Sequence, residues 1–261
     1  MHGIQTLFSR FGPADWALAV VVTVMSVGMA YVRSPRAKSL IYNLPIPFSA
    51  ALVATGRGVD VTHLLGMFGV WAFVWAVRAF HLGLGIPILA ADLLAIALYA
   101  GFGLSMARVV PAAGTPAECV LFWTAVAALL AAGLLGLRIA RRNEPSHRSQ
   151  LPFYVKLPLV FLLVTMLVLL KHSLRGFMPS FPMVTVFAVY EARYSLHTLG
   201  RRFTFFMLGF AVMATILRLI LPVGAAPPPV SFLLALGAGW AAYLPLCWWL
   251  DRRDGIAAGR Q

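Results

Sequence analysis

Nine apolar runs, most of them about as long as a bilayer is thick, follow one another along the chain. A transmembrane helix needs about 20 apolar residues, within a range of about 17–25. The runs cover residues 14–32, 40–55, 64–82, 86–109, 119–137, 153–170, 177–190, 203–221 and 230–250. They predict an all-α fold: a polytopic transmembrane helical bundle of about nine spans.

The composition agrees with this prediction and excludes several function classes. Hydrophobic residues make up 61% of the chain and charged residues 11%, whereas soluble domains have about 45–50% and about 25%. So few charges cannot cover a water-exposed surface, which excludes a typical cytosolic enzyme, a disordered regulator and a secreted disulfide scaffold. The two cysteines, Cys119 and Cys247, match no metal-binding or redox spacing.

The net charge of +13 comes from basic clusters between the apolar runs. This placement is typical of membrane topology rather than of nucleic-acid binding. With nine spans, six Lys and Arg residues fall on the side of the N-terminus and fifteen on the opposite side. Because cationic loops stay in the cytoplasm, we expect the N-terminus outside and the C-terminus inside. The cytoplasmic loops should contact anionic lipids of the bilayer, and no nucleic acid.

Two of the runs are short and interrupted by proline, and they occupy corresponding places in the two halves of the chain. Residues 44–66 align with residues 178–200 at one offset of 134, with identities that include Pro45 and Pro179, His63 and His197, Leu65 and Leu199, and Gly66 and Gly200. Regions 1–113 and 151–261 then hold four spans each, separated by a linker span and a basic loop in 114–150. The odd span between them inverts the second copy, so we expect inverted-topology repeats.

Inverted repeats recur in secondary transporters, whose solute site lies at the repeat interface. Short or proline-interrupted spans in matching positions are the best sequence indication of that site. The candidate pathway residues on this ground are Pro45, Pro47, Pro179 and Pro182. Prolines that merely kink tightly packed helices would give the same pattern.

Ionisable residues inside apolar runs are costly and are functional candidates by default. Asp92 lies about 10 Å into its run and Arg78 about 6 Å from the same membrane face, at a rise of 1.5 Å per residue. The two could therefore meet, either as a structural pair or as a contact to the solute. Glu191 and Tyr190 close the seventh run. His63 and His197 could relay protons or begin helices with a hydrogen bond.

The second half of the chain also carries a family resemblance. Residues 158–249, with the segment Pro179-Ser180-Phe181-Pro182, with Tyr190 and with the terminal Cys247-Trp248, resemble the GlpM-like family of small bacterial inner-membrane proteins. Members of that family are single four-helix units with a Pro-x-Phe-Pro segment in the second helix. The resemblance implies a bacterial inner-membrane location and a fused, divergent duplication, but no catalytic residues or substrate.

These features predict a small secondary transporter or permease for a small polar or anionic solute. One alternative is a non-transporting membrane subunit that scaffolds a partner complex, for instance in envelope polysaccharide assembly, and a homodimer is also possible. An intramembrane lipid-modifying enzyme is disfavoured, because no acid–base, nucleophile or metal constellation stands out. We therefore expect no catalytic residue, no metal site and no cofactor.

Overall fold

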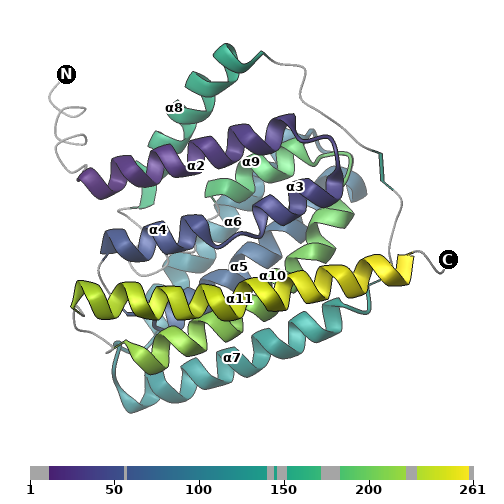
Figure 1. The fold of residues 1–261 in the computed structure, drawn as a ribbon. Coiled ribbons are helices and arrows are strands. Elements are labelled where there is room, and N and C mark those ends of the chain that lie inside the picture. Colours follow the sequence, from purple (N-terminus) through teal and green to yellow (C-terminus); the bar gives the residue numbers. More distant parts are fainter. Residues whose placement is uncertain are drawn as a thin grey trace, which may run out of the picture.

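The structure, a computed structural model, describes residues 12–55, 58–139, 144–145, 152–171, 183–221 and 228–258. Within these ranges every regular element is a helix and none is a strand (Figure 1). The prediction of an all-α fold is therefore confirmed for the described residues. Pro179 and Pro182 lie outside them.

The helices begin where the sequence supplies caps. The first half contains α2 (Pro13–Tyr31), α3 (Pro35–Tyr42), α4 (Ile46–Thr55), α5 (Val61–Arg78), the π-helical turn η1 (Ala79–Gly83) and α6 (Ile88–Val109). Then follow α7 (Pro116–Gly136), α8 (Phe153–Lys171), α9 (Met183–Glu191), α10 (Leu196–Ile220) and α11 (Pro229–Ala258). At α3 and α7 a side-chain hydroxyl, of Ser34 or Thr115, accepts a backbone N–H of the first turn, and a proline follows it. Both are established helix-start signals.

Five helices are long and apolar enough to cross a membrane: Val61–Gly83, Ile88–Val109, Pro116–Gly136, Leu196–Ile220 and Val230–Arg253. They fit a multi-pass membrane protein. Two more of the expected spans contain shorter apolar helices, Asp15–Tyr31 and Phe153–Leu162. The nine-span arrangement, with four spans on each side of a linker span, is thus not confirmed.

In the described residues, the remaining two expected spans contain only short helices. The run at 40–55 is divided between α3 and α4, with Asn43 as the C-cap of α3 and Pro45 just before α4. Proline has no N–H and disfavours helical geometry at the residue before it, so a helix rarely continues through such a site. In the run at 177–190, the described helix α9 has nine residues. Its length is about 14 Å at 1.5 Å per residue, half of a hydrocarbon core about 30 Å thick.

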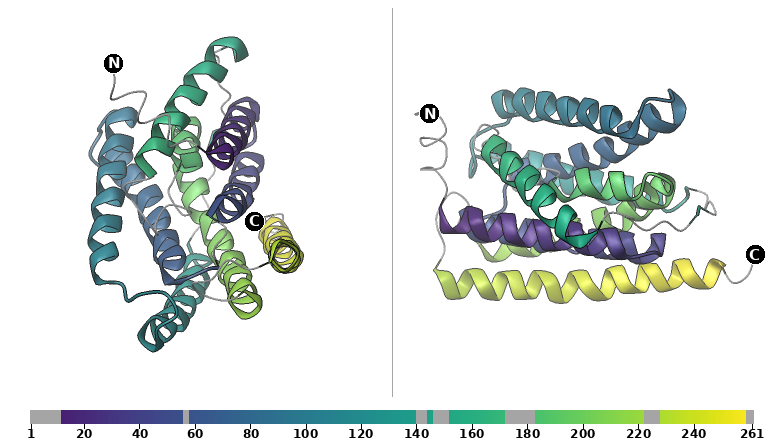
Figure 2. Two further views of the ribbon diagram at one scale, coloured as in Figure 1. Left: turned by 90° about the vertical axis from the view of Figure 1, so that its left-hand side faces the viewer. Right: turned by 90° about the horizontal axis from the view of Figure 1, so that it is seen from above.

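Helices α5 and α10 form the centre of the bundle. Of the apolar window in α10, 67% is buried, compared with 50% in α5 and 22–33% in α6, α7 and α11. α5 and α10 pack against each other, with α6 and α7 also against α5, and α7 and α11 also against α10. α6 and α11 lie on opposite sides of the molecule (Figure 2). Their outward leucines, such as Leu93 and Leu234, suit contact with lipid.

The two ends of the bundle differ in the helices that begin there. Glu118, in the first turn of α7, accepts hydrogen bonds from the Val61 backbone at the start of α5 and from Arg218 in the last turn of α10. α5 and α7 therefore begin where α10 ends, and α10 runs antiparallel to both. We name this the Glu118 end. At the opposite end, the Lys156 end, α8 begins and its Lys156 forms an ion pair with Glu191, the last residue of α9.

Candidate functional site

Charged side chains inside an apolar bundle are expensive, so their partners decide whether they are structural or functional. Three ion-paired groups join different helices in the described part of the chain. They are Glu118 with Arg218, Arg202 with Asp251, and Lys156 with Glu191. Asp92 is also buried but belongs to none of them.

The Glu118 group has a complete set of partners. One carboxylate oxygen accepts from Val61 N at 3.0 Å and from Arg218 Nη1 at 3.2 Å. The other accepts from Arg218 Nη2 at 2.6 Å and from Gly114 N at 3.3 Å. Arg218 also donates to the carbonyl of Val59 and lies over the ring of Phe122. A closed network of this kind holds α5, α7 and α10 together and leaves neither carboxylate oxygen of Glu118 without a partner.

The Arg202 group is structural as well. Its guanidinium pairs with Asp251 on α11, and its backbone carbonyl accepts a hydrogen bond from the Asn43 side chain at 2.9 Å. The Asn43 carbonyl in turn accepts from the hydroxyl of Tyr243. These bonds fasten the break between α3 and α4 to the two helices α10 and α11.

The third group, the lysine cluster of Lys38, Lys156 and Glu191, brings together three helices from both halves of the chain. Lys38 lies in α3, Lys156 in the first turn of α8, and Glu191 at the end of α9. The Lys156 ammonium pairs with Glu191 Oε1, and Lys38 donates to the Glu191 backbone carbonyl at 3.0 Å. That carbonyl is one of those that the end of a helix leaves without an intrahelical partner. All three residues are 2–4% exposed.

The lysine cluster carries more positive than negative charge. Burial lowers the pKa of the Lys38 ammonium, the Glu191 carboxylate opposes this effect, and the positive charges of Lys156 and Arg193 add to it. Glu191 Oε2 is enclosed and has no hydrogen-bond partner. Three cations close to one carboxylate, of which only Lys156 pairs with it, make a site that favours a further anion.

Aromatic rings lie beside two of these cations, Lys156 and Arg193. The Tyr31 ring lies 6.0 Å from Lys156 Nζ. Arg193 lies 5.0 Å from the ring of Tyr190 and 4.8 Å from that of Tyr194, and it donates to the Tyr190 carbonyl. Tyr194 is half-exposed, so the Arg193 end of this group lies at the bundle surface. Cation–π contacts of this kind hold the arginine in place without neutralising it.

The expected pair of Arg78 and Asp92 does not form. Neither residue has an ion pair with the other or with any residue in the described ranges. The Arg78 guanidinium lies 5.2 Å from the centre of the Trp75 ring, and its Nε is enclosed without an acceptor. Asp92, in the second turn of α6, is 5% exposed, and its Oδ1 has no hydrogen-bond partner.

The two histidines lie at opposite ends of the bundle, so they do not form one relay. His63 Nδ1 lies 2.9 Å from Asp60 Oδ1 and 3.2 Å from Asp60 N, an arrangement that caps the start of α5. His197 lies in the first turn of α10, and its ring centre is 6.1 Å from that of the Trp75 ring, with the two rings nearly perpendicular. Its backbone N–H, like that of Thr198, donates to the carboxylate of Glu144. Pro45 lies between α3 and α4, where it separates the two helices, and Pro47 lies in the first turn of α4, where proline is tolerated.

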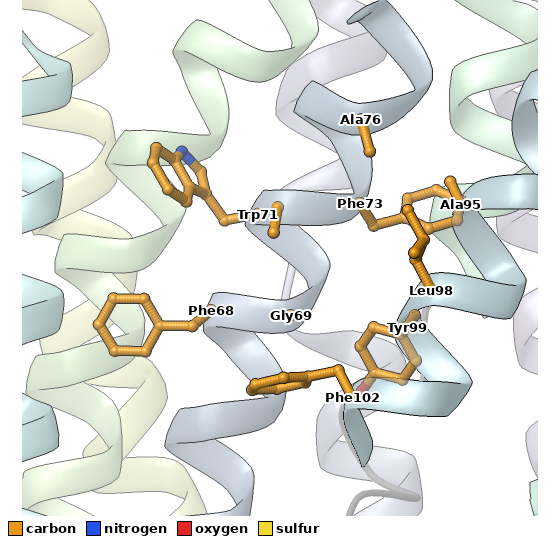
Figure 3. Close-up of a pocket in the computed structure, with 10 residues that line it drawn as sticks. Phe68, Gly69, Trp71, Phe73, Ala76, Ala95, Leu98, Tyr99 and Phe102 are labelled. Carbon is orange, nitrogen blue, oxygen red and sulfur yellow. The ribbon is translucent and has the colours of Figure 1, made fainter. Parts of the chain in front are cut away.

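An apolar pocket of about 390 Å³ lies along the seam between α5 and α6. Its lining residues include Gly69, Phe73, Ala95, Tyr99 and Phe102, together with Phe68 and Trp71, whose side chains point away from α6 (Figure 3). A Cβ at position 69 would lie 2.8 Å from the Tyr99 ring, so glycine permits this close approach. The pocket offers almost no polar group, and we assign it no solute.

Lys38 and Lys156 are the site residues that the sequence patterns missed. In the sequence, both are basic residues next to apolar runs and add only to the positive charge of the expected cytoplasmic side. For Lys156 a signal existed, because it lies one turn inside the run at 153–170, where an ionisable residue is a functional candidate. Lys38 precedes its run, and its partner Glu191 is 153 residues away, which no local pattern could reveal.

Asp60, which precedes α5, gives a pH-dependent prediction. Burial raises the pKa of its carboxyl, but the hydrogen bond and charge of His63 and the hydrogen bonds from Thr62 outweigh this and lower it from 3.8 to about 2. The carboxylate therefore stabilises the fold above pH 3.8, by about 2 kcal/mol, and this contribution is lost as the pH falls toward 2. The difference in melting temperature between the wild type and Asp60→Asn should shrink between about pH 5 and about pH 2. A constant difference would contradict the assignment.

Comparison of the chain with protein-family models, with curated proteins and with solved structures finds no significant match. In its described residues, the protein is all-helical and has five helices that are long and apolar enough to span a membrane.

Proposed function

We propose that the chain is a membrane carrier for a small anionic solute and that the lysine cluster is its binding site. The observation that supports this most is the excess of positive charge around the buried Lys38: its ammonium is close enough to Lys156, Arg193 and Glu191 to be affected by all three charges, and only Glu191 is negative. An entering carboxylate or phosphate group would replace Glu191 as the partner of Lys156. Glu191 would then need Lys38 or Arg193 as its new partner, so that the solute binds without leaving a buried charge unpaired.

The packing of the two halves supports an inverted repeat. α5 packs against α6 as α10 packs against α11, and α5 and α10 lie antiparallel against each other. The short helices cross between the halves, since α9 packs against α5 and α6 while α3 packs against α10. The lysine cluster lies where α3 and α9 meet, and sites at repeat interfaces are typical of such transporters.

The charge distribution supports an orientation with the Lys156 end in the cytoplasm. Arg201, Arg202, Arg252 and Arg253 lie at this end with the lysine cluster, and positively charged ends stay inside. The N-terminus would then lie outside and the C-terminus inside. Arg252 and Arg253 stack on Trp248 and Trp249, a pairing suited to an anionic lipid surface. The GlpM-like resemblance of residues 158–249 adds a bacterial inner membrane to this proposal.

Uptake into proteoliposomes tests the proposed function. The probes are radiolabelled phosphate, sulfate, lactate and succinate, with neutral glycerol as the comparison solute. We expect the wild type to take up at least one anion and Lys156→Gln or Lys38→Gln to reduce this uptake about tenfold or more, the change produced by about 1.4 kcal/mol of lost interaction.

Arg253→Gln is the matched control, because it removes an exposed cation at the same end and should leave uptake unchanged. Equal uptake by Lys156→Gln and the wild type would contradict the site. If the wild type moves none of the anions but copurifies stoichiometrically with another membrane protein, the chain is a scaffolding subunit instead.

A further inference from the structure

We propose that Asp92 binds and releases the proton whose movement is coupled to that of the anionic solute, with Arg78 as the counter-charge after release. This inference rests on the proposed function. The observation behind it is a carboxyl group buried against a neighbouring helix, with no hydrogen bond or ion pair in the described ranges.

Asp92 belongs to the inward face of α6. Ala91, Ala95 and Tyr99 lie on the same face and are 0–3% exposed, whereas Leu93 and Leu98 point outward. A charged carboxylate in such surroundings has neither water nor a donor to stabilise it, and the neutral, protonated form avoids that cost. The arrangement in the structure therefore suits Asp92 with its proton bound.

A proton suits this site better than a metal cation does. Hard cations need several oxygen ligands, whereas the described residues contain no group of three or more His, Cys, Asp or Glu side chains. One carboxylate can bind one proton without further ligands. A solute anion that moves together with a proton also carries less net charge through the apolar bundle.

The elements packed against α6 are α5, η1 and α9. Their titratable side chains are His63 and Arg78 on α5, His81 in η1, and Tyr190 and Glu191 on α9. His63 caps the far end of α5, His81 Nδ1 lies 2.8 Å from the Ile86 carbonyl, and Glu191 is paired with Lys156. Arg78 is the remaining cation, and its Nε has no acceptor.

The seam between α5 and α6 has features that suit a movement of one helix relative to the other. Directly after Arg78 the helix passes into the π-helical turn η1, and Gly85 follows with a φ of +69°; such π-helical turns occur frequently at functional sites. The apolar pocket continues along the seam to Ala95, one turn from Asp92 (Figure 3). After proton release, the Asp92 carboxylate would be attracted to Arg78, and the unfilled volume lets the two helices adjust.

Such an adjustment reaches the lysine cluster through α9. This helix packs against both α5 and α6 and ends at Glu191. A shift of the seam would therefore move the carboxylate that competes with the solute for Lys156. Proton release at Asp92 and anion release at the lysine cluster then become linked events.

Carbodiimide labelling of the purified protein tests proton binding without any solute. Dicyclohexylcarbodiimide reacts with protonated carboxyls in apolar surroundings, and mass spectrometry locates the product. We expect labelling at Asp92 that decreases as the pH rises from about 5 to about 9, none in Asp92→Asn, and little at the ion-paired Glu118 and Asp251. Arg78→Gln should shift the pH midpoint upward by about one unit, because it removes the counter-charge. Labelling that is absent, or equal at every pH, would overturn the proposal.

Transport then tests the coupling, with the anion that the wild type takes up fastest as the probe. Asp92→Asn should lose accumulation driven by a pH gradient about tenfold or more, yet keep exchange of labelled for unlabelled anion, which needs no net proton movement. Ser105→Ala, an exposed change on the same helix, should keep both. Wild-type accumulation by Asp92→Asn would overturn the coupling and leave the carrier proposal standing. If no anion moves at all, the carrier and its coupling both fail, and labelling alone decides whether Asp92 exchanges a proton.

Discussion

Glu118→Gln is expected to destabilise the protein by about 3–5 kcal/mol, the range measured when one partner of a buried ion pair is removed. Four donors converge on this carboxylate, which is 0% exposed: two from Arg218 and the backbone N–H groups of Val61 and Gly114. An amide offers one acceptor oxygen and points its own N–H groups at the remaining donors. The Arg218 charge would be left buried without a counter-charge. Thermal unfolding in detergent, followed by circular dichroism, measures the loss.

Two further variants keep this prediction falsifiable. Arg108→Gln removes an exposed cation in the last turn of α6 and should change stability by less than about 0.5 kcal/mol. The double variant Glu118→Gln, Arg218→Gln should be more stable than Glu118→Gln alone, because it removes the unpaired charge. Equal melting temperatures for Glu118→Gln and Arg108→Gln would show that the network contributes nothing.

The apolar runs predicted the long helices well, because a lipid-facing or fully buried helix must be apolar along its whole length. Val61–Arg78, Ile88–Val109 and Pro116–Gly136 each lie within a few residues of the expected run. The expected run at 203–221 begins seven residues after the observed start of α10 at Leu196, because the charged Arg201 and Arg202 precede the apolar residues. In the structure both arginines are buried, with Arg201 bonded to the Ile139 carbonyl and Arg202 to Asp251.

The partners of the site residues could not be predicted in the same way. Depth along a helix follows from residue counting, but the direction in which a side chain points does not. Arg78 and Asp92 have similar expected depths, yet Arg78 follows Trp75, whose ring meets His197 and Gly200 on α10. The Arg78 side chain therefore stacks on Trp75 rather than reaching the carboxyl on α6.

Long-range pairs were beyond any local pattern for a related reason. Glu118 and Arg218 are 100 residues apart, and Lys156 and Glu191 are 35 apart. Each residue lies near the end of an apolar run, where a single charge normally points to the headgroups. The side chains of these four residues are buried because α7 packs against α10 and α9 packs against α3. The lysine cluster is thus a property of the fold, although Glu191 was a candidate from the sequence.

Gly209→Ala and Gly136→Ala are expected to be the most damaging of the conservative helix substitutions, at about 1–3 kcal/mol each. A Cβ at position 209 would lie 2.6 Å from the Tyr243 ring and 2.7 Å from Cys247 Sγ, and one at position 136 would lie 2.1 Å from Thr204 Cγ2. Neither neighbour can yield easily. Tyr243 is 1% exposed and donates to the Asn43 carbonyl, and Thr204 is fully buried on α10. Small residues at these points let α7 and α11 approach α10 closely, as in other membrane helix pairs.

Gly237→Ala and Gly101→Ala are the matched controls, because no atom lies within 4 Å of a Cβ built at either position. Alanine is the better helix former by about 0.8–1.0 kcal/mol, so these two variants should melt at or above the wild-type temperature. Whether a glycine-to-alanine substitution raises or lowers the melting temperature thus depends on whether the glycine faces another helix. Destabilisation by all four variants would mean that helix flexibility, rather than close packing against α10, explains these glycines. A loss confined to Gly209→Ala and Gly136→Ala would locate the tightest packing of the bundle on the two sides of α10.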